Sequence, residues 1–384
     1  MRILITDLNI KLDGHKYGYV NNLLSFIEKQ TTNNVYFILT NYSTEFQLES
    51  TKKNITILST TTEQQETIAS QKHYFQKSGK EWEIIDQHCI ENKIEHLILM
   101  EIDPYQVEIG KKKTPYSIAG IWFRPYARMQ KEGPGLKNQI NFWRTLIQKK
   151  WIMKWALTNK NLKKVFILND EAMPNWLDHR RFFYLPDPYF EYQTIEKFDL
   201  RERYNIPKEN LILLQFGNMD ERKNNENIIA ALNEMNPEKA QKITLLIIGK
   251  FKAGYLEKIK TLIPEESKYQ TIIKDEFVSD EEMESTFKQS DVILRMNINF
   301  FGSSGIVGQA ANHNKPCIVS NNGVMAEQVE KYKLGKIIDP YDVNTIKETI
   351  IFYLDSPAER KIDGSYYKQT HNLEAFGSTL LNTK

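Results

Sequence analysis

The chain has 384 residues, of which 41% are hydrophobic and 26% charged, and a formal net charge of +2. This length is typical of two domains of roughly 150 to 200 residues, and no run approaches the roughly 18 apolar residues that span a bilayer. Cys89 and Cys317 show neither disulfide nor metal-ligand spacing, and the small net charge gives no general attraction to nucleic acid. We therefore expect a soluble two-domain enzyme of a reducing cytoplasm, with no nucleic-acid partner and no metal.

The first half of the sequence alternates short apolar runs with helical patterns. Met1–Asp7 reaches an acidic residue too early for a signal peptide, so we interpret it as the first strand. Expected strands are Ile3–Ile5, Val35–Leu39, Ile55–Leu58, His96–Met100, Ile118–Phe123 and Val165–Leu168. Tyr19–Glu28 and Lys80–Asn92 show helical patterns between them. This alternation predicts an α/β domain with a parallel sheet.

Two side chains of this half follow expected strands and precede proline, which places them at strand ends. They are Asp103 and Arg124. Ligands of open α/β folds bind at the carboxyl edge of the sheet. Asp103 is a candidate base or acceptor-orienting group and Arg124 a candidate for a phosphate or an anionic acceptor. A buried structural ion pair is an equally good interpretation of the two.

The segment Leu136–Val165 is strongly basic, with eight Lys or Arg residues and no acidic one. It also contains three of the six tryptophans, Trp143, Trp151 and Trp155. A helix here would gather aromatic and aliphatic groups on one side and lysines on the others. That composition fits a helix on an anionic membrane surface, and it fits a helix packed on the sheet equally well.

The strand and helix pattern restarts in the second half, after Pro186-Asp187-Pro188, where two prolines block regular structure. Expected strands are Leu211–Phe216, Ile243–Ile248, Thr271–Ile273, Asp291–Leu294, Pro316–Val319 and Gly335–Ile338. Helical stretches such as Asn227–Met235 and Asp280–Lys288 separate them. A second α/β domain therefore follows the first, with domains expected at 1–188 and 189–364.

Two cations follow the first strand of this second domain. Leu211–Phe216 ends at Gly217, and Arg222 and Lys223 come shortly after it. Cations at the carboxyl edge of a sheet can stabilise the negative charge that develops on a phosphate-rich leaving group. An exposed charge pair in a loop is the alternative.

A turn of small residues lies later in the same domain, between the strands Asp291–Leu294 and Pro316–Val319. It consists of Gly302, Ser303, Ser304 and Gly305, and Ile306 begins a helical pattern. Residues without bulk let the backbone approach a ligand, and the first N–H groups of the helix point at it. Arg295, just before this turn, is a further candidate for binding phosphate. The turn favours a phosphate-bearing ligand and thereby a ligand-binding role for the cations.

The second half resembles the nucleotide-sugar-binding half of GT-B glycosyltransferases, in particular the large retaining group with two Rossmann-like domains. The residues that carry the resemblance are Phe216-Gly217, Arg222-Lys223, Leu245–Gly249, Phe277-Val278-Ser279, Gly302–Ala310, Lys315–Val319, Gly323–Glu327, Gly335 and Asp339-Pro340. By this resemblance, Phe277 and Val278 contact the nucleoside and Glu327 belongs to a family motif. The fold is expected to be two Rossmann-like domains facing a cleft, with 365–384 returning to the first domain. The loop with Gly14 and His15 would then face donor phosphate and acceptor, where His15 could handle a proton.

The sequence departs from this group at two positions that normally hold glutamates. They are Phe301, which cannot replace a carboxylate, and Gln309, whose amide can still bind ribose hydroxyls. An arginine that often follows the first glycine is replaced by Asn218, and Arg222 is a candidate substitute.

The resemblance implies a sugar transferase of polysaccharide biosynthesis. It would use a nucleotide diphosphate sugar and a glycan or lipid-linked acceptor, with retention and with no cofactor or metal. A nucleotide-sugar epimerase of the same fold and a catalytically weak nucleotide-sugar-binding protein are the alternatives. We expect a cytoplasmic protein, with a peripheral position at the inner face of the cell membrane through 136–165 left open.

Overall fold

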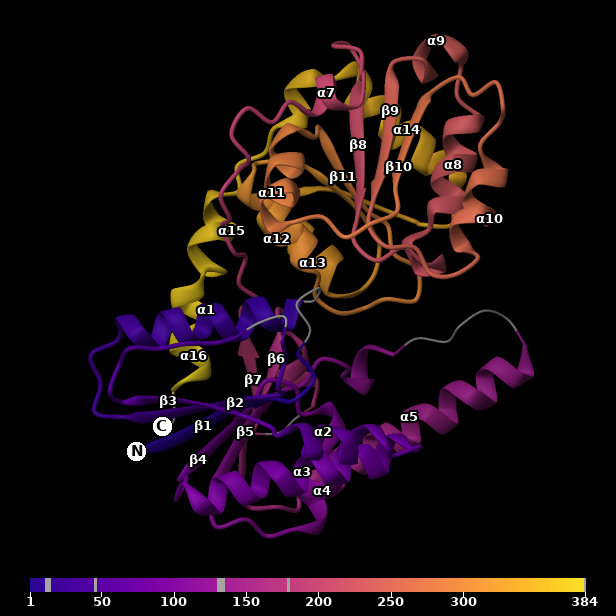
Figure 1. Ribbon diagram of the computed structural model, residues 1–384. Helices are drawn as coiled ribbons and strands as arrows, with labels where there is room; N and C mark the ends of the chain where they lie inside the picture. Colours follow the sequence, from indigo (N-terminus) through magenta and orange to yellow (C-terminus); the bar gives the residue numbers. More distant parts are fainter. Residues whose placement is uncertain (11–14, 45–46, 130–134, 178–179, 383–384) are drawn as a thin grey trace. The chain divides into compact units, whose positions relative to one another are not determined.

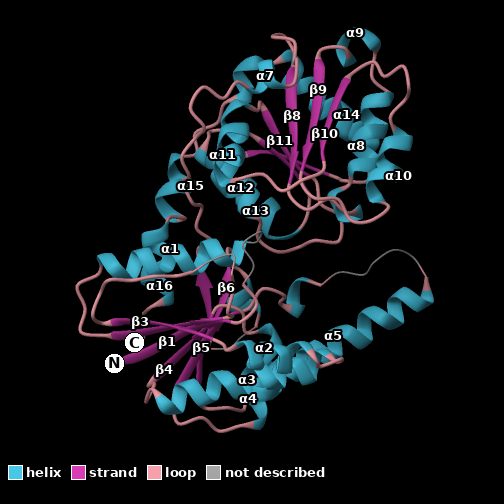
Figure 2. Cartoon of the chain, viewed as in Figure 1, coloured by secondary structure: helices cyan, strands magenta, loops and turns pink. Residues whose placement is uncertain are grey.

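The computed structural model describes residues 1–10, 15–44, 47–129, 135–177 and 180–382. The chain forms two units, one of Met1–Pro186 with Leu373–Lys384 and one of Asp187–Asn372. Each unit is a parallel β-sheet with helices on both faces, as Figures 1 and 2 show. Among the described residues, no helix combines the length and the hydrophobicity needed to cross a bilayer.

The sheet of the first unit has the strand order β3-β2-β1-β4-β5-β6-β7, all neighbours being parallel. The strands are β1 (Arg2–Asp7), β2 (Val35–Thr40), β3 (Ile55–Ser59), β4 (His96–Leu99), β5 (Ser117–Ile121), β6 (Leu162–Leu168) and β7 (Phe182–Leu185). The sequence did not predict β7, which is a short edge strand with only two of four residues buried. The run is apolar throughout, but an apolar run of only four residues cannot be assigned to a strand by its pattern alone.

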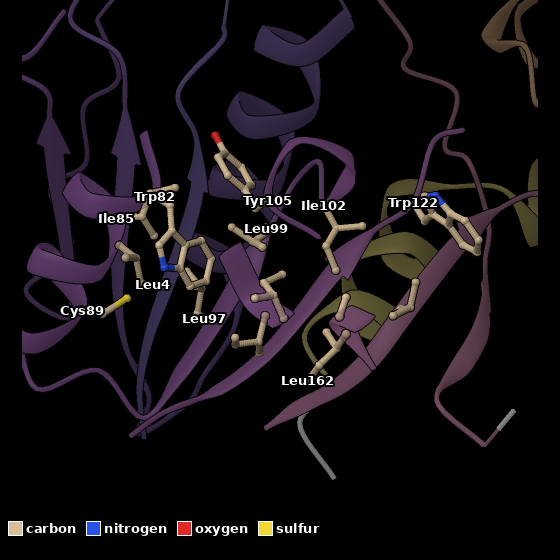
Figure 3. Close-up of a cluster of buried hydrophobic side chains, with 14 of the residues drawn as sticks. Leu4, Trp82, Ile85, Cys89, Leu97, Leu99, Ile102, Tyr105, Trp122 and Leu162 are labelled. Carbon is tan, nitrogen blue, oxygen red and sulfur yellow. The ribbon is translucent and has the colours of Figure 1, made fainter. Parts of the chain in front are cut away.

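Helices cover both faces of this sheet. The helical segments are α1 (His15–Lys29), α2 (Thr62–Ala69), α3 (Tyr74–Glu91), η1 (Asp103–Tyr105), α4 (Gln106–Lys111), η2 (Tyr126–Arg128), α5 (Leu136–Ala156), α6 (Met173–Trp176) and α16 (Leu373–Leu380). Successive strand residues point to opposite faces, so Ile3 packs with α1 and α16 whereas Leu4 packs with α3. Figure 3 shows this second cluster, in which Trp82 of α3 lies against Leu97 and Leu99 of β4.

The sheet of the second unit has the order β10-β9-β8-β11-β12-β13, again parallel throughout. The strands are β8 (Leu211–Phe216), β9 (Ile243–Ile248), β10 (Gln270–Lys274), β11 (Val292–Arg295), β12 (Cys317–Ser320) and β13 (Gly335–Ile338). All six residues of β9 are buried, because a parallel strand covered by helices on both faces is apolar along its whole length.

The helices of the second unit also divide between the two faces. The helical segments are α7 (Leu200–Arg203), η3 (Glu221–Lys223), α8 (Asn225–Asn233), α9 (Pro237–Ala240), α10 (Tyr255–Leu262), α11 (Asp280–Gln289), α12 (Gly305–Asn312), α13 (Gly323–Tyr332), α14 (Val343–Asp355), η4 (Pro357–Arg360) and α15 (Ser365–Thr370). One core contains residues of α8, α10 and α14, and the other contains residues of α11, α12 and α13. The α/β architecture expected from the sequence is thus confirmed in both units.

Both sheets have a topological switch point, where consecutive connections run to opposite sides of the first strand. In the second unit it lies between β8 and β11, which are direct neighbours with Leu294 opposite Gln215. Ligands of doubly wound sheets bind outside the carboxyl ends of the strands at such a point. The loops that follow Phe216 and Arg295 therefore define the place to look for a site.

Candidate functional site

Two glycines follow the neighbouring strands β8 and β9, beside the switch point of the second unit. Gly217 follows β8 with a φ of +104°, and Gly249 follows β9 with a φ of +141°. Their N–H groups continue the sheet ladder, donating to the carbonyl oxygens of Ile248 and Lys274 at 3.0 Å. A Cβ at Gly249 would overlap the carbonyl oxygen of Gly217. Glycine is therefore required at position 249 for the β8 loop to take this path.

Lys223 ends η3 and is only 6% exposed. Its Nζ donates to the carbonyl oxygen of Phe216 at 3.2 Å, and the Gln215 side-chain amide donates to the Lys223 carbonyl at 2.8 Å. Burial lowers the pKa of Lys223 well below its ordinary value, and the positive charge of Arg295 lowers it further. The ammonium group thus lies at the end of β8 in an environment that disfavours its charge.

Arg295 ends β11, the neighbour of β8, and is held beside the small-residue turn. Its Nε donates to Ser304 Oγ at 2.9 Å. Its Nη1 is buried and has no hydrogen-bond partner among the described residues. Burial, together with the charge of Arg222, lowers the pKa of Arg295 to about 10. A buried guanidinium nitrogen without a partner is a strong candidate for contact with an anion.

Lys223, Arg295 and Ser304 are thus brought together, although they lie far apart in the chain. No ion pair joins a carboxylate of a described residue to either cation, although the charge of Asp220, which is itself paired with Arg222, acts to raise the pKa of both. Two cations held close in a buried setting are costly without a counter-charge. The arrangement is therefore suited to a bound anion.

Arg222 has a different environment from the one the sequence suggested. Its side chain is 56% exposed and forms a forked ion pair with Asp220, with Nη2 and Oδ2 at 2.6 Å. Hydrogen bonds to Asp220 raise the pKa of Arg222. Its carbonyl oxygen accepts the N–H of Ile298 at 2.9 Å, which joins the loops that follow β8 and β11. In this structure the main chain of Arg222 holds the two loops together while its charge is paired.

The small-residue turn leads into α12 and is held from two further directions. Ser303 Oγ donates to Asp187 Oδ2 at 2.7 Å, and the carbonyl of Phe301 accepts the N–H of Val324 in α13 at 3.0 Å. Ser304 is the N-cap residue of α12, and its hydroxyl bonds Arg295 instead of the helix. The first N–H groups of α12, at Gly305 and Ile306, are consequently available to a ligand as helix N-termini generally are.

Gln309 and the residues expected to contact the nucleoside, Phe277 and Val278, differ in their exposure to solvent. Gln309 is 7% exposed, and its Nε2 donates to the carbonyl of Phe190 at 3.0 Å while its Oε1 is buried with no partner among the described residues. Phe277 follows β10 and is 51% exposed, and Val278 packs partly against the core. Glu327 lies on the exposed side of α13.

The candidates of the first unit lie at the carboxyl ends of β4 and β5. The Asp103 carboxylate accepts the N–H groups of Phe123 and Arg124, at 2.9 and 3.2 Å. Burial raises the pKa of Asp103 to about 6, and the Arg124 side chain is exposed. His15 is the first residue of α1, and nothing further is described of its side chain; Gly14 lies outside the described residues.

Three further residues position this site, and none of them was assigned a role there from the sequence. Gln215 supports Lys223, Gly249 fits against Gly217, and Asp187 binds Ser303. Gln215 could have been found, because it is the one polar residue of the buried strand Leu211–Phe216. Gly249 was among the residues that carry the family resemblance, and it follows an apolar strand as Gly217 does. Asp187 gives no local signal, because its partner Ser303 is distant in sequence. Within the described ranges, no group of three or more His, Cys, Asp and Glu residues is placed to hold a metal ion.

Solved structures of GT-B glycosyltransferases resemble this chain over its whole length. WaaG, a glycosyltransferase of lipopolysaccharide biosynthesis, is 12% identical with a TM-score of 0.66, covering 100% of both chains. Sucrose-phosphate synthase from Thermosynechococcus elongatus is 14% identical with a TM-score of 0.70, covering 99% of this chain and 96% of that one. Alr3699/HepE from Anabaena in complex with UDP-glucose is 14% identical with a TM-score of 0.67, covering 100% and 99%. The protein has the GT-B fold.

The family model described as glycosyl transferases group 1 matches residues 196–370. This range lies within the second unit and includes Lys223, Arg295 and Ser304. A comparison with curated proteins gave no match. The family model thus matches most of the second unit, and together with the GT-B fold it confirms the glycosyltransferase resemblance that the sequence predicted.

Proposed function

We propose that this protein transfers a sugar from a nucleotide diphosphate sugar to a glycan or lipid-linked acceptor, with retention at the anomeric carbon and without a metal ion. The observation that carries the proposal is the buried pair Lys223 and Arg295 beside Ser304 at the switch point. A diphosphate supplies the negative charge that this pair lacks. The proposal agrees with the UDP-glucose found in the solved structure of Alr3699/HepE.

The same two cations are also placed to stabilise the diphosphate as it leaves the sugar. As the bond between sugar and diphosphate breaks, negative charge grows on the diphosphate oxygens, and preorganised cations in a buried site stabilise it without reorganisation. The N–H groups of Gly305 and Ile306 add donors at the same place. In the mechanism we propose, no protein nucleophile is used, and the departing diphosphate assists deprotonation of the acceptor. Arg222 takes part after release from Asp220.

Contacts to the rest of the donor are assigned from the sequence resemblance and from exposure. Gly217, Gly302 and Ser303 provide backbone surface without bulk for the diphosphate and sugar. The exposed ring of Phe277, with Val278 beside it, is suited to pack on a nucleobase. Gln309 offers its unpartnered Oε1 to a ribose hydroxyl, and Glu327 completes the family motif near the sugar.

The acceptor is assigned to residues of the first unit. Asp103, whose pKa is raised to about 6, is the proposed acceptor-orienting group or base, because a pKa close to the operating pH favours proton transfer. Arg124 is exposed and suited to an anionic acceptor. Gly14 and His15 remain predictions from the sequence.

The proposed function is tested with the full-length protein and a panel of UDP, GDP and ADP sugars, with and without EDTA. We expect release of one free nucleoside diphosphate, through transfer or its hydrolytic side reaction, and no loss of rate with EDTA. Conversion of the sugar without nucleotide release would instead show an epimerase. Binding without turnover of any donor would show a nucleotide-sugar-binding protein and contradict the proposal.

Binding of a diphosphate is expected to take up a proton in the pH range between the lowered pKa of Lys223 and its ordinary value of about 10.5. The pKa of Lys223 is lowered in the free protein, and a neighbouring anion raises it again, so the amine becomes protonated when the diphosphate binds. Isothermal titration calorimetry with UDP in buffers of different ionisation enthalpy measures this uptake. Lys223→Met should remove it, and an equal uptake in the variant and the parent would contradict this assignment.

We place the reaction in polysaccharide biosynthesis, with the enzyme peripheral at the inner face of the cell membrane. A lipid-linked acceptor is presented at such a surface, and the basic helix α5 belongs to the unit assigned to the acceptor.

A further inference from the structure

Helix α5 is fixed to the first unit mainly by its C-terminal end. Met153 and Ala156 are fully buried in the core beside α3 and α4. The Trp155 ring packs so closely on α4 that a Cβ at Gly110 would lie 2.9 Å from it. The N-terminal part has no fully buried residue, and in Figure 1 it extends beyond α3 and α4.

The face of α5 opposite this anchor carries a row of large apolar side chains. The row consists of Leu136, Ile140, Trp143, Ile147 and Trp151, which are 74%, 57%, 51%, 52% and 69% exposed. Their spacing of four, three, four and four residues keeps them on one side of a helix. We call these five residues the apolar row. An exposed row of this size on a water-soluble surface indicates a binding surface.

Basic residues lie on both sides of the apolar row. Lys137, Arg144, Lys150 and Lys154 are all exposed. At 100° per residue Lys150 falls on one flank and Lys137 and Arg144 on the other, whereas Lys154 lies in line with the row at its C-terminal end. The helix contains no Asp or Glu. An apolar row between two basic flanks matches the boundary between acyl chains and anionic headgroups.

We propose that α5 lies in the headgroup region of an anionic lipid bilayer, with the apolar row directed toward the acyl chains and the four basic residues toward lipid phosphates. This assignment specifies the surface at which the proposed transfer occurs, and in that respect it rests on the proposed function. A second copy of the chain is a poorer occupant, because two α5 helices would bring basic flanks together with no acidic residue to pair with them.

The test uses the full-length protein without any donor and vesicles of phosphatidylcholine, alone or mixed equally with phosphatidylglycerol. We expect flotation with the mixed vesicles, weak flotation with phosphatidylcholine alone, and a decrease as salt is raised, because salt screens the contacts with the headgroups. Brominated acyl chains should quench the fluorescence of Trp143 and Trp151. Binding to the headgroups alone, without contact with the acyl chains, would not produce this quenching.

Two sets of variants separate the apolar and the electrostatic contributions. Replacing Lys137, Arg144 and Lys150 by Gln should lower the partition coefficient about a hundredfold, since each basic residue near an anionic surface contributes about fivefold. Trp143→Ser with Trp151→Ser should lower it at least about tenfold on both vesicle types. The matched controls are Lys52→Gln with Lys53→Gln, and Ile90→Ser with Tyr341→Ser, all at exposed positions. The controls should bind as the parent does.

Several results would overturn the assignment. They are no flotation of the parent protein, equal losses in the control variants, and concentration-dependent dimerisation abolished by the tryptophan variants in the absence of vesicles. Thermal unfolding of every variant shows that the fold is kept. Hydrolysis of a water-soluble nucleotide sugar should be unchanged in the α5 variants. A parent protein that hydrolyses the nucleotide sugar but does not bind vesicles would contradict this proposal alone. A parent protein that binds vesicles but does not hydrolyse any nucleotide sugar would contradict the proposed function alone.

Discussion

Replacing Lys223 by methionine is expected to lower kcat by about 10²–10³-fold, the usual effect of losing one preorganised charge-stabilising group, without lowering the free energy of unfolding. Methionine has a similar shape and places no charge in this buried position. Because burial lowers the pKa of Lys223, the lysine disfavours folding of the free protein. Steady-state kinetics on the donor identified by the panel, with urea unfolding in parallel, measures both effects.

The pH dependence gives this prediction a second readout. Lys223 has a folded-state pKa below its unfolded value of about 10.5, so the unfolded chain binds more protons in that interval. The parent therefore gains stability as pH rises through the lowered pKa toward the unfolded value. Lys223→Met should lack this gain, and the difference between the two proteins should narrow with rising pH. Lys208→Met, at an exposed lysine of the same unit, should change neither property. Unchanged kcat in Lys223→Met would contradict the site.

Replacing Gly249 by alanine is expected to lower the free energy of unfolding by about 3 kcal/mol or more. Its φ of +141° is a conformation that residues with a Cβ rarely adopt, and the added carbon would overlap the carbonyl oxygen of Gly217. Any relaxation must move Gly217, the residue beside Lys223, so donor affinity should fall as well. Chemical denaturation and UDP titration measure the two consequences.

The matched control is Gly254→Ala. Gly254 also has a positive φ, +77°, but an added Cβ would meet nothing within 4 Å. Only backbone strain remains there, and it costs about 1–2 kcal/mol. Equal losses at 249 and 254 would mean that the contact between Gly249 and Gly217 is unimportant.

The fold was largely predictable, because its signals are local. Buried parallel strands are continuous apolar runs, and the amphipathic helices between them are visible as periodicity. The edge strand Phe182–Leu185 was missed because an apolar run of only four residues does not distinguish a strand from other short buried segments. The order of the strands was not available from these patterns, since it depends on which strands pair across the sheet.

The sequence predicted the chemistry of the candidate site better than it predicted which residues form the site. The sequence pointed to Lys223 and to the turn at Gly302–Gly305, which the structure places near one another through Arg295. From the sequence, the adjacent cations Arg222 and Lys223 were equally good candidates for binding the diphosphate. The structure separates them, because a turn of η3 buries one and leaves the other in an ion pair with Asp220. Neighbouring residues in a short irregular turn follow no period from which burial could be inferred.

Residue types and their order by themselves determined the α/β class and the two similar halves, and they predicted a phosphate-binding chemistry in the second half. These follow from short-range propensities and from glycine and serine at a strand-to-helix turn. Only the tertiary structure decided that Arg295 has a buried nitrogen with no partner among the described residues, although its neighbouring nitrogen bonds Ser304. It also decided that the apolar row of α5 is exposed while Met153 and Ala156 fill the core. Burial is a property of which segments pack together, and an apolar side chain looks the same in a sequence whether a core or a membrane covers it.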